Sequence, residues 1–61
     1  MTIPVKIYGI VRVVALHSEE TEITKSYFAN EKMRDEALML FIADFPEDEF
    51  YPFEYEEEVE V

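Results

Sequence analysis

The side chains of this sequence with the clearest chemical potential are the carboxylates of its last third. Residues 44–61 hold nine acids and no base, whereas residues 1–43 hold six acids and five bases. Side chains two residues apart on a strand lie about 6.6–6.8 Å apart, close to the ~6.8 Å that two base-pair rises span along the DNA helix axis. Within 53-FEYEEEVEV-61 four glutamates have this spacing, Glu54, Glu56, Glu58 and Glu60. The turn Glu47, Asp48 and Glu49 would extend this predicted row of negative charge.

A row of this kind could occupy a phosphate-binding groove on another protein. Attraction between unlike charges speeds such encounters, so the expected partner is a protein with a basic surface, for example a nucleic-acid-binding enzyme. Direct binding to nucleic acid is disfavoured because affinity for phosphates comes from Lys and Arg, and an anionic membrane surface is disfavoured for the same reason. The alternative is that the glutamates keep the chain soluble and stop an edge strand from pairing with other chains.

Catalysis and metal binding find little support in the sequence. A nucleophilic triad would need His17 beside an activated Ser or Thr and a carboxylate, but Ser18 is only its neighbour in an expected turn. The four carboxylates of 44-DFPEDE-49 lack the spacing and the glycine of an EF-hand loop, which leaves weak surface cation binding as an alternative. One histidine and no cysteine cannot make a zinc site. We expect no enzyme, no catalytic residue, no metal site and no cofactor.

The chain has room for a single small acidic domain, residues 1–61. Ordering costs roughly 1.5 kcal/mol per residue, which nearly cancels what so small a core gains by burial. Since disulfides and metals are excluded, a homodimer is the remaining means of stabilisation. Lys6 interrupts the apolar start, so no signal peptide is expected, and 37-ALMLFIA-43 is too short to cross a bilayer. A cytoplasmic protein is expected, in the host cytoplasm if a phage encodes it.

Two strands are predicted in the first half. In 3-IPVKIYGIVRVVAL-16 every odd position is apolar or glycine, which is typical of a strand with one buried face, and 22-EITKSYFA-29 favours extended structure. The polar segment 17-HSEET-21 between them predicts a hairpin turn. Pro4 is expected at an edge because it cannot donate to a ladder, and Gly9 marks either a bulge or close packing.

A helix is predicted in 30-NEKMRDEALMLFIADF-45. Asn30 suits the N-cap position, and Pro46 stops the helix because it cannot continue the hydrogen-bonding pattern. One side of the helix is predicted to face the core. This apolar stripe consists of Met33, Ala37, Leu40 and Phe41.

A third strand is predicted in 50-FYPFEYEEEVEV-61. The odd positions are apolar except for Glu57, and the even positions after Pro52 are glutamates, which gives the period of two that strands have. For residues 58–61 both a strand and a disordered tail remain open.

Together these elements predict an α+β fold of order β-β-α-β. The sheet has three antiparallel strands in the order 2-1-3, and the helix packs on one face. The odd face of the first strand is expected to meet the helix, which leaves Lys6 and Arg12 on the outer face with the glutamates. Candidate dimer-interface residues are the remaining apolar side chains and two tyrosines that could equally fill the core. They are Ile10, Val14, Leu16, Met39, Tyr51 and Tyr55.

Two functions remain open. In size and charge, though in no motif, the chain resembles the short acidic proteins of phages and mobile elements that inhibit nucleic-acid enzymes by imitating DNA. The resemblance implies a non-enzymatic inhibitor that occupies the basic, nucleic-acid-binding surface of a host or defence enzyme. The alternative is a small structural or assembly subunit that acts through apolar surfaces and homo-oligomerisation.

Overall fold

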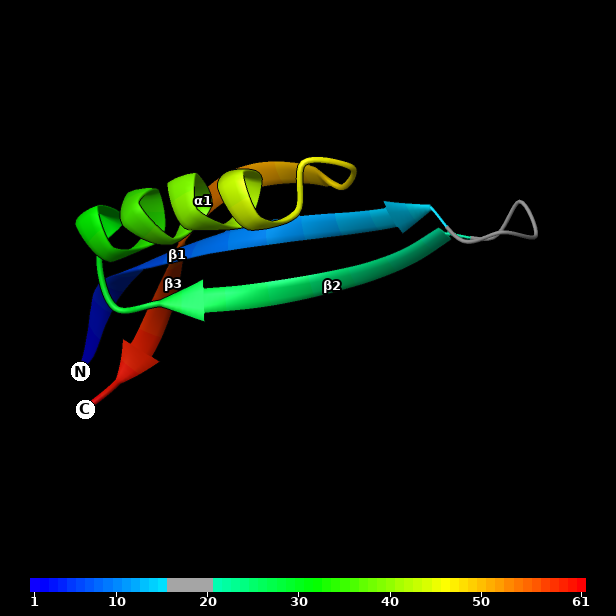
Figure 1. Cartoon of the computed structure of the whole chain (residues 1–61). Helices are drawn as coiled ribbons and strands as arrows, with labels where there is room; N and C mark the ends of the chain where they lie inside the picture. The colour runs from blue at the N-terminus through cyan, green and yellow to red at the C-terminus, as the bar shows by residue number, and fades with distance from the viewer. Residues whose placement is uncertain (16–20) are drawn as a thin grey trace.

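The computed structural model describes residues 1–15 and 21–61. The elements are β1 (Thr2–Ala15), β2 (Thr21–Phe28), α1 (Glu31–Asp44) and β3 (Glu49–Glu60). The strands form one antiparallel sheet in the order β2-β1-β3, with the helix on one side of it (Figure 1). The predicted α+β fold, strand order and single helix are confirmed. The predicted turn between β1 and β2 lies, except for Thr21, outside the described residues, as do His17 and Ser18.

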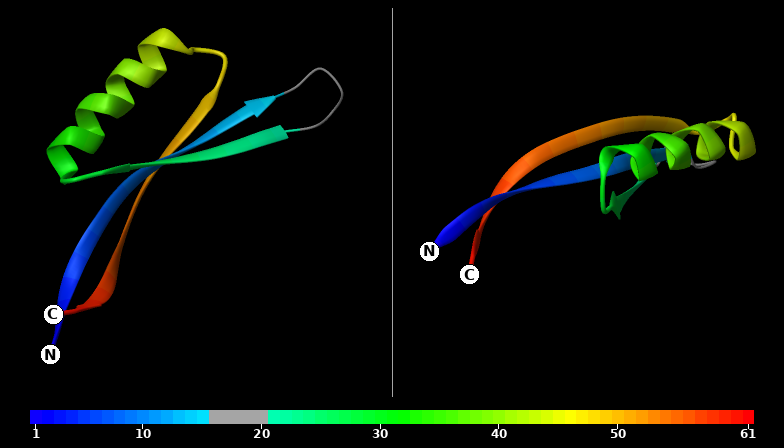
Figure 2. Two further views of the ribbon diagram at one scale, coloured as in Figure 1. Left: turned by 90° about the horizontal axis from the view of Figure 1, so that it is seen from below. Right: turned by 90° about the vertical axis from the view of Figure 1, so that its left-hand side faces the viewer.

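β1 is the central strand, but its two neighbours cover different lengths of it. It pairs with β3 along residues 2–13 and with β2 only along residues 8–15. Residues 2–7 of β1 and 55–60 of β3 therefore form a two-stranded arm, which runs beyond β2 and the helix and carries both chain ends (Figure 2). Because β3 continues to Glu60, residues 58–60 form a strand and not a tail, and Val61 follows the strand.

α1 begins and ends as its sequence predicts. The side chain of Asn30 caps it, since Oδ1 accepts a hydrogen bond from the backbone N–H of Met33 at 2.9 Å. At the other end the N–H of Phe45 donates to the carbonyl of Phe41 at 2.8 Å. Pro46 follows and has no N–H to continue the ladder. Within the described residues no helix is long and apolar enough to cross a membrane.

The helix covers the even face of the sheet, which corrects the prediction that it would cover the odd face. Ile10 lies beneath it and is 1% exposed. The rings of Phe41 and Phe50 stack with 5.6 Å between their centroids, and the Arg12 guanidinium lies 4.1 Å from the centre of the Phe45 ring. Arg12 is thus packed under the end of α1 and not on the outer face.

The lengths of the two elements explain this choice of face. α1 has 14 residues and extends about 21 Å at ~1.5 Å per residue. β1 also has 14 residues but extends about 46 Å at ~3.3 Å per residue. One helix can cover less than half of the long apolar odd face, whereas it matches the short apolar segment around Ile10. Alternation shows which residues share a face, but it does not show which face the helix takes.

The contact side of α1 also differs from the predicted stripe. Ala37 and Phe41 are half-buried as predicted, but Met33 and Leu40 are exposed. Arg34, which is 8% exposed, takes a contact position instead. Apolar residues lie nearly all round the second half of the helix, so the sequence pattern does not single out one side.

Candidate acidic binding surface

Four exposed glutamates of β3 form a row on one side of the arm and its base. Each is paired across the ladder with an even residue of β1, so the row lies on the helix side of the sheet, beyond the part that the helix covers. The expected shared face with Lys6 is confirmed, but this face is the one that carries the helix. We call Glu54, Glu56, Glu58 and Glu60 the glutamate row.

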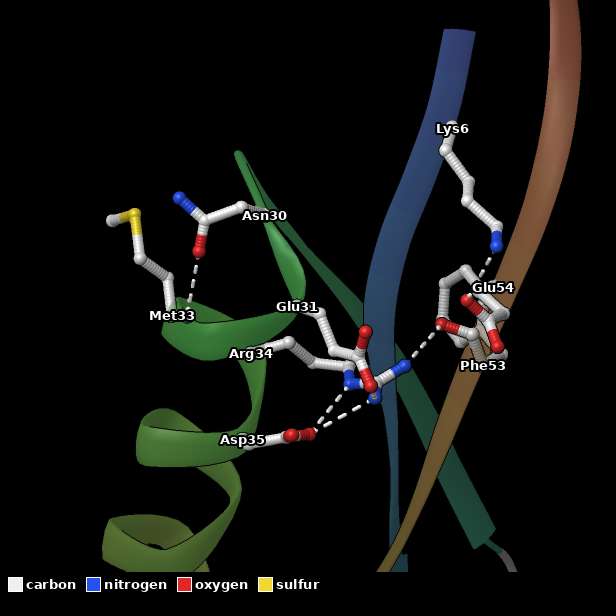
Figure 3. A network of polar contacts seen from close by, with 8 residues as sticks. All are labelled: Lys6, Asn30, Glu31, Met33, Arg34, Asp35, Phe53 and Glu54. Carbon is white, nitrogen blue, oxygen red and sulfur yellow. Dashed lines mark hydrogen bonds and ion pairs between the residues drawn. The ribbon is translucent and has the colours of Figure 1, made fainter.

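Little positive charge faces the glutamate row. Lys6 Nζ lies 3.5 Å from Glu54 Oε2 (Figure 3), and both side chains are largely exposed. A pair of this kind contributes about 0–1 kcal/mol. Among the described residues no ion pair reaches the other three glutamates of the row. Glu57 adds a carboxylate on the opposite side of the arm, across from Val5.

A buried arginine fixes the helix to β3 at the base of the arm. Arg34 Nη1 donates to the carbonyl of Phe53 at 3.3 Å, and its guanidinium is paired with Asp35 at 2.9 Å and Glu31 at 3.8 Å (Figure 3). The guanidinium also lies 5.5 Å from the centre of the Tyr8 ring. Sequence reasoning missed this role of Arg34. The signal in the sequence was the pair of acids at i−3 and i+1, Glu31 and Asp35, which neutralise the charge of Arg34 from within the same helix.

The acidic turn before β3 does not extend the row, contrary to the prediction. Asp48 is an internal partner of Arg12, whose Nε and Nη2 donate to Asp48 Oδ2 at 2.9 and 2.6 Å, and the Asp48 side chain is only 13% exposed. Glu49 accepts a hydrogen bond from the Tyr51 hydroxyl at 3.0 Å. This bond and the negative charge of Glu49 raise the pKa of Tyr51. Glu47 is exposed at the far end of β3 from the row.

The predicted interface residues separate into different environments. Ile10 is core and cannot form an interface, because the helix covers it. Val14 is half-buried, and Met39 is exposed on the helix. Tyr51 and Tyr55 are both about half exposed and lie on the odd face of the sheet. The remaining one, Leu16, lies outside the described residues.

The odd face of the sheet, which we call the open sheet face, has no helix over it. It consists of the odd residues of β1 and their cross-strand partners on β2 and β3. Three charged side chains lie on it, and the rest are mainly aliphatic and aromatic. Its charged members are Lys25, Glu49 and Glu57, and its most exposed apolar members on the paired strands are Ile3, Ile23, Tyr27, Tyr51 and Tyr55.

An aromatic cluster lies at the centre of the open sheet face. The Phe53 ring lies over Gly9, where an added Cβ would collide with it. Phe53 meets Tyr27 edge to face at 5.9 Å and stacks with Tyr55 at 6.1 Å between centroids. The ladders pass Gly9 without an extra residue, so this glycine marks close packing and not a bulge.

Neither metal coordination nor similarity to a known protein explains these surfaces. Within residues 1–15 and 21–61 no group of three or more His, Cys, Asp or Glu side chains is placed to hold a metal ion. No family model, curated protein or solved structure matches the chain. The function must therefore be argued from the glutamate row and the open sheet face.

Proposed function

We propose that this chain is a non-enzymatic interaction protein that uses the glutamate row to occupy a basic surface on another protein. One observation carries the proposal. Four exposed carboxylates are held at regular intervals on a paired strand, and among the described residues Lys6 is the only cation paired with them. Binding to a basic surface would neutralise these carboxylates. The gain in free energy would be large because only one cation of the described residues is paired with the row.

The backbone gives the row its regularity. β1 holds β3 through an uninterrupted antiparallel ladder, so successive carboxylates of the row start from points about 6.6–6.8 Å apart. Two base-pair rises along the DNA helix axis span a similar length, ~6.8 Å, so a groove that binds the DNA backbone suits charges at this interval. The most concrete version is a phage-type inhibitor that imitates DNA on a host or defence enzyme in the cytoplasm.

The test is to remove the charge of the row while keeping its shape. Glu54→Gln, Glu56→Gln, Glu58→Gln and Glu60→Gln are combined in one variant and used for affinity capture from cells of the source organism at low and high salt. The parent chain is expected to retain a nucleic-acid-binding protein at low salt and release it at high salt, and duplex DNA should compete. The variant should bind roughly 100-fold more weakly, mainly through slower association.

A matched control removes the same number of charges elsewhere. Glu22→Gln, Glu36→Gln, Asp44→Asn and Glu47→Gln lie outside the row, and all four side chains are exposed. This control should keep most of the affinity. Undiminished binding by the row variant, or an equal loss in both variants, would refute the role of the row.

The second candidate function is a structural or assembly subunit, and the open sheet face favours it. Binding through apolar surfaces would change little with salt, in contrast to binding through the row. If Met39 on the helix takes part, Met39→Glu should also disrupt the assembly. A captured partner that survives high salt and the loss of the row would support this function.

A further inference from the structure

The single chain exposes more surface than a compact protein of its mass. Its accessible surface is 4969 Å², whereas a folded monomer of 7.3 kDa exposes about 4,200 Å². The difference is roughly 800 Å², which is what each partner contributes to a protein interface of standard size. The radius of gyration agrees, at 14.3 Å against about 10.5 Å for a compact domain of this length.

The open sheet face is an apolar part of the molecule to which this excess surface can be assigned. The open sheet face runs the length of β1, and its apolar side chains include Ile23, Tyr27 and Tyr55, which are 62%, 59% and 45% exposed. Monomeric proteins rarely leave a contiguous apolar surface of this extent uncovered. The surface is therefore one that another protein layer covers.

The protein that covers the open sheet face must be present when the chain folds. Among the described residues, Ile10 is the only fully buried large side chain, so the helix side alone gives a very small core. The ordering entropy of a small domain needs more apolar burial than this. A second copy of the same chain is the one partner that is present whenever the chain is made, and its open sheet face offers the same apolar surface.

The edges of the arm and of β3 are poorly suited to join two copies, whereas the other edge strand, β2, contains no proline. Pro4 lies in the part of β1 that has no β2 beside it, and Pro52 lies in β3, which is an edge strand. Proline cannot donate to a new ladder, and charged edge residues such as those of the glutamate row discourage pairing. Two copies are therefore better joined through faces than through the edges of the arm and of β3.

The charge distribution also favours association of two copies through their open sheet faces. The chain carries a net charge of −10, so two copies repel one another wherever their carboxylates approach. The glutamate row lies on the helix side of the sheet, and stacked sheets lie about 10 Å apart. Packing of the open sheet faces points the two rows away from each other, and the charged side chains that it brings to the interface are Lys25, Glu49 and Glu57 of each copy.

We propose that the open sheet face is a homodimer interface, on which a second copy packs its own open sheet face to form a two-sheet core with the helices outside. This inference does not depend on the proposed function, because it concerns the opposite side of the sheet from the row. The Tyr27, Phe53 and Tyr55 cluster lies at its centre and is expected to supply most of the binding energy, as buried aromatic clusters commonly do.

The test compares the masses of three proteins by sedimentation equilibrium. The parent chain is expected at twice 7.3 kDa. Ile23→Thr, Tyr27→Thr and Tyr55→Thr together remove apolar area but keep strand-forming residues, and should weaken the dimer at least 100-fold. Met39→Gln and Leu40→Gln remove exposed apolar side chains from α1 and should leave the dimer unchanged. A monomeric parent chain, or dissociation of the helix variant alone, would overturn the proposal.

A measurement on the parent chain decides the case even if the threonine variant does not fold. Isotope-filtered NOE spectra of mixed labelled and unlabelled chains report only contacts between copies. Contacts from the Tyr27 and Tyr55 rings to valine and isoleucine methyls of β1 are expected. Contacts between copies that are confined to Met39 and the helix would rule out this interface, as would a spectrum with none.

Discussion

At the scale of single residues, Gly9 determines whether the aromatic cluster can form. A Cβ at this position would collide with the Phe53 ring and lie 2.7 Å from the carbonyl oxygen of Ser26. We therefore expect Gly9→Ala to lower the free energy of unfolding by about 1–3 kcal/mol, as overpacking does, measured by urea denaturation. Adding Phe53→Leu relieves the collision with the ring but not that with the Ser26 carbonyl, so the two changes should be partly less than additive. Gly9→Ala with parental stability would contradict the close packing.

Tyr51 offers a residue-scale test of the start of β3. Its hydrogen bond to Glu49, and then the charge of Glu49, raise the Tyr51 pKa above the ordinary value of 10.0. A raised folded-state pKa means that this contact stabilises the protein below pH 10 and is lost as the pH rises through the folded-state pKa. Glu49→Ala should move the Tyr51 pKa down towards 10.0, measured by NMR of the tyrosine ring carbons. Glu47→Ala in the turn before β3 should not, and an unmoved pKa in Glu49→Ala would disprove the contact.

At the scale of elements, the attachment of α1 to β3 depends on a buried charged group, the Arg34 guanidinium. Arg34 is 8% exposed and donates to the Phe53 carbonyl, which Arg34→Met would leave without this donor. Loss of such a bond costs about 1–3 kcal/mol, and urea denaturation should show it. Lys32→Met is the matched control, because Lys32 is exposed and its one ion pair within the described residues is with Glu36 at 3.9 Å. Equal unfolding midpoints for the two variants would show that Arg34 does not anchor the helix.

The same elements show how far the sequence leads. Period-two alternation and the cap at Asn30 were enough to predict all four elements and their order, because these signals are local. The covered face was predicted wrongly, because both faces of β1 are partly apolar and helix length decided between them. Asp48 was placed in the binding surface because nothing local to it indicates Arg12, which lies far away in sequence and reaches it only in the fold.

At the scale of the whole molecule, the proposed dimer would make stability depend on concentration, because two copies would share one core. Each dimer releases two chains on unfolding, so a hundredfold rise in concentration stabilises the folded state by about 2.7 kcal/mol. We expect the melting temperature to rise by several degrees over this range, followed by circular dichroism. The same melting temperature at every concentration would mean that the chain folds alone.

Added salt is expected to have opposite effects on the stability of the chain and on its binding to a basic partner. With a net charge of −10 on 61 residues, folding brings like charges together, and the glutamate row is the densest part of them. Raising NaCl from 0.01 to 1 M shortens the screening length from about 30 Å to about 3 Å, so the melting temperature should rise. Over the same range the binding of a basic partner should weaken, because screening removes the attraction that forms the complex.

The row variant separates these two effects of salt. Changing Glu54, Glu56, Glu58 and Glu60 to Gln removes mutual repulsion, so this variant should melt at a higher temperature than the parent chain in 0.01 M NaCl and respond less to added salt. Because it should also lose the basic partner, the variant would be more stable and less active. A parent melting temperature that does not change with salt would show that the charge of the row is already neutralised in the folded protein, and the row would then have no charge to offer a partner.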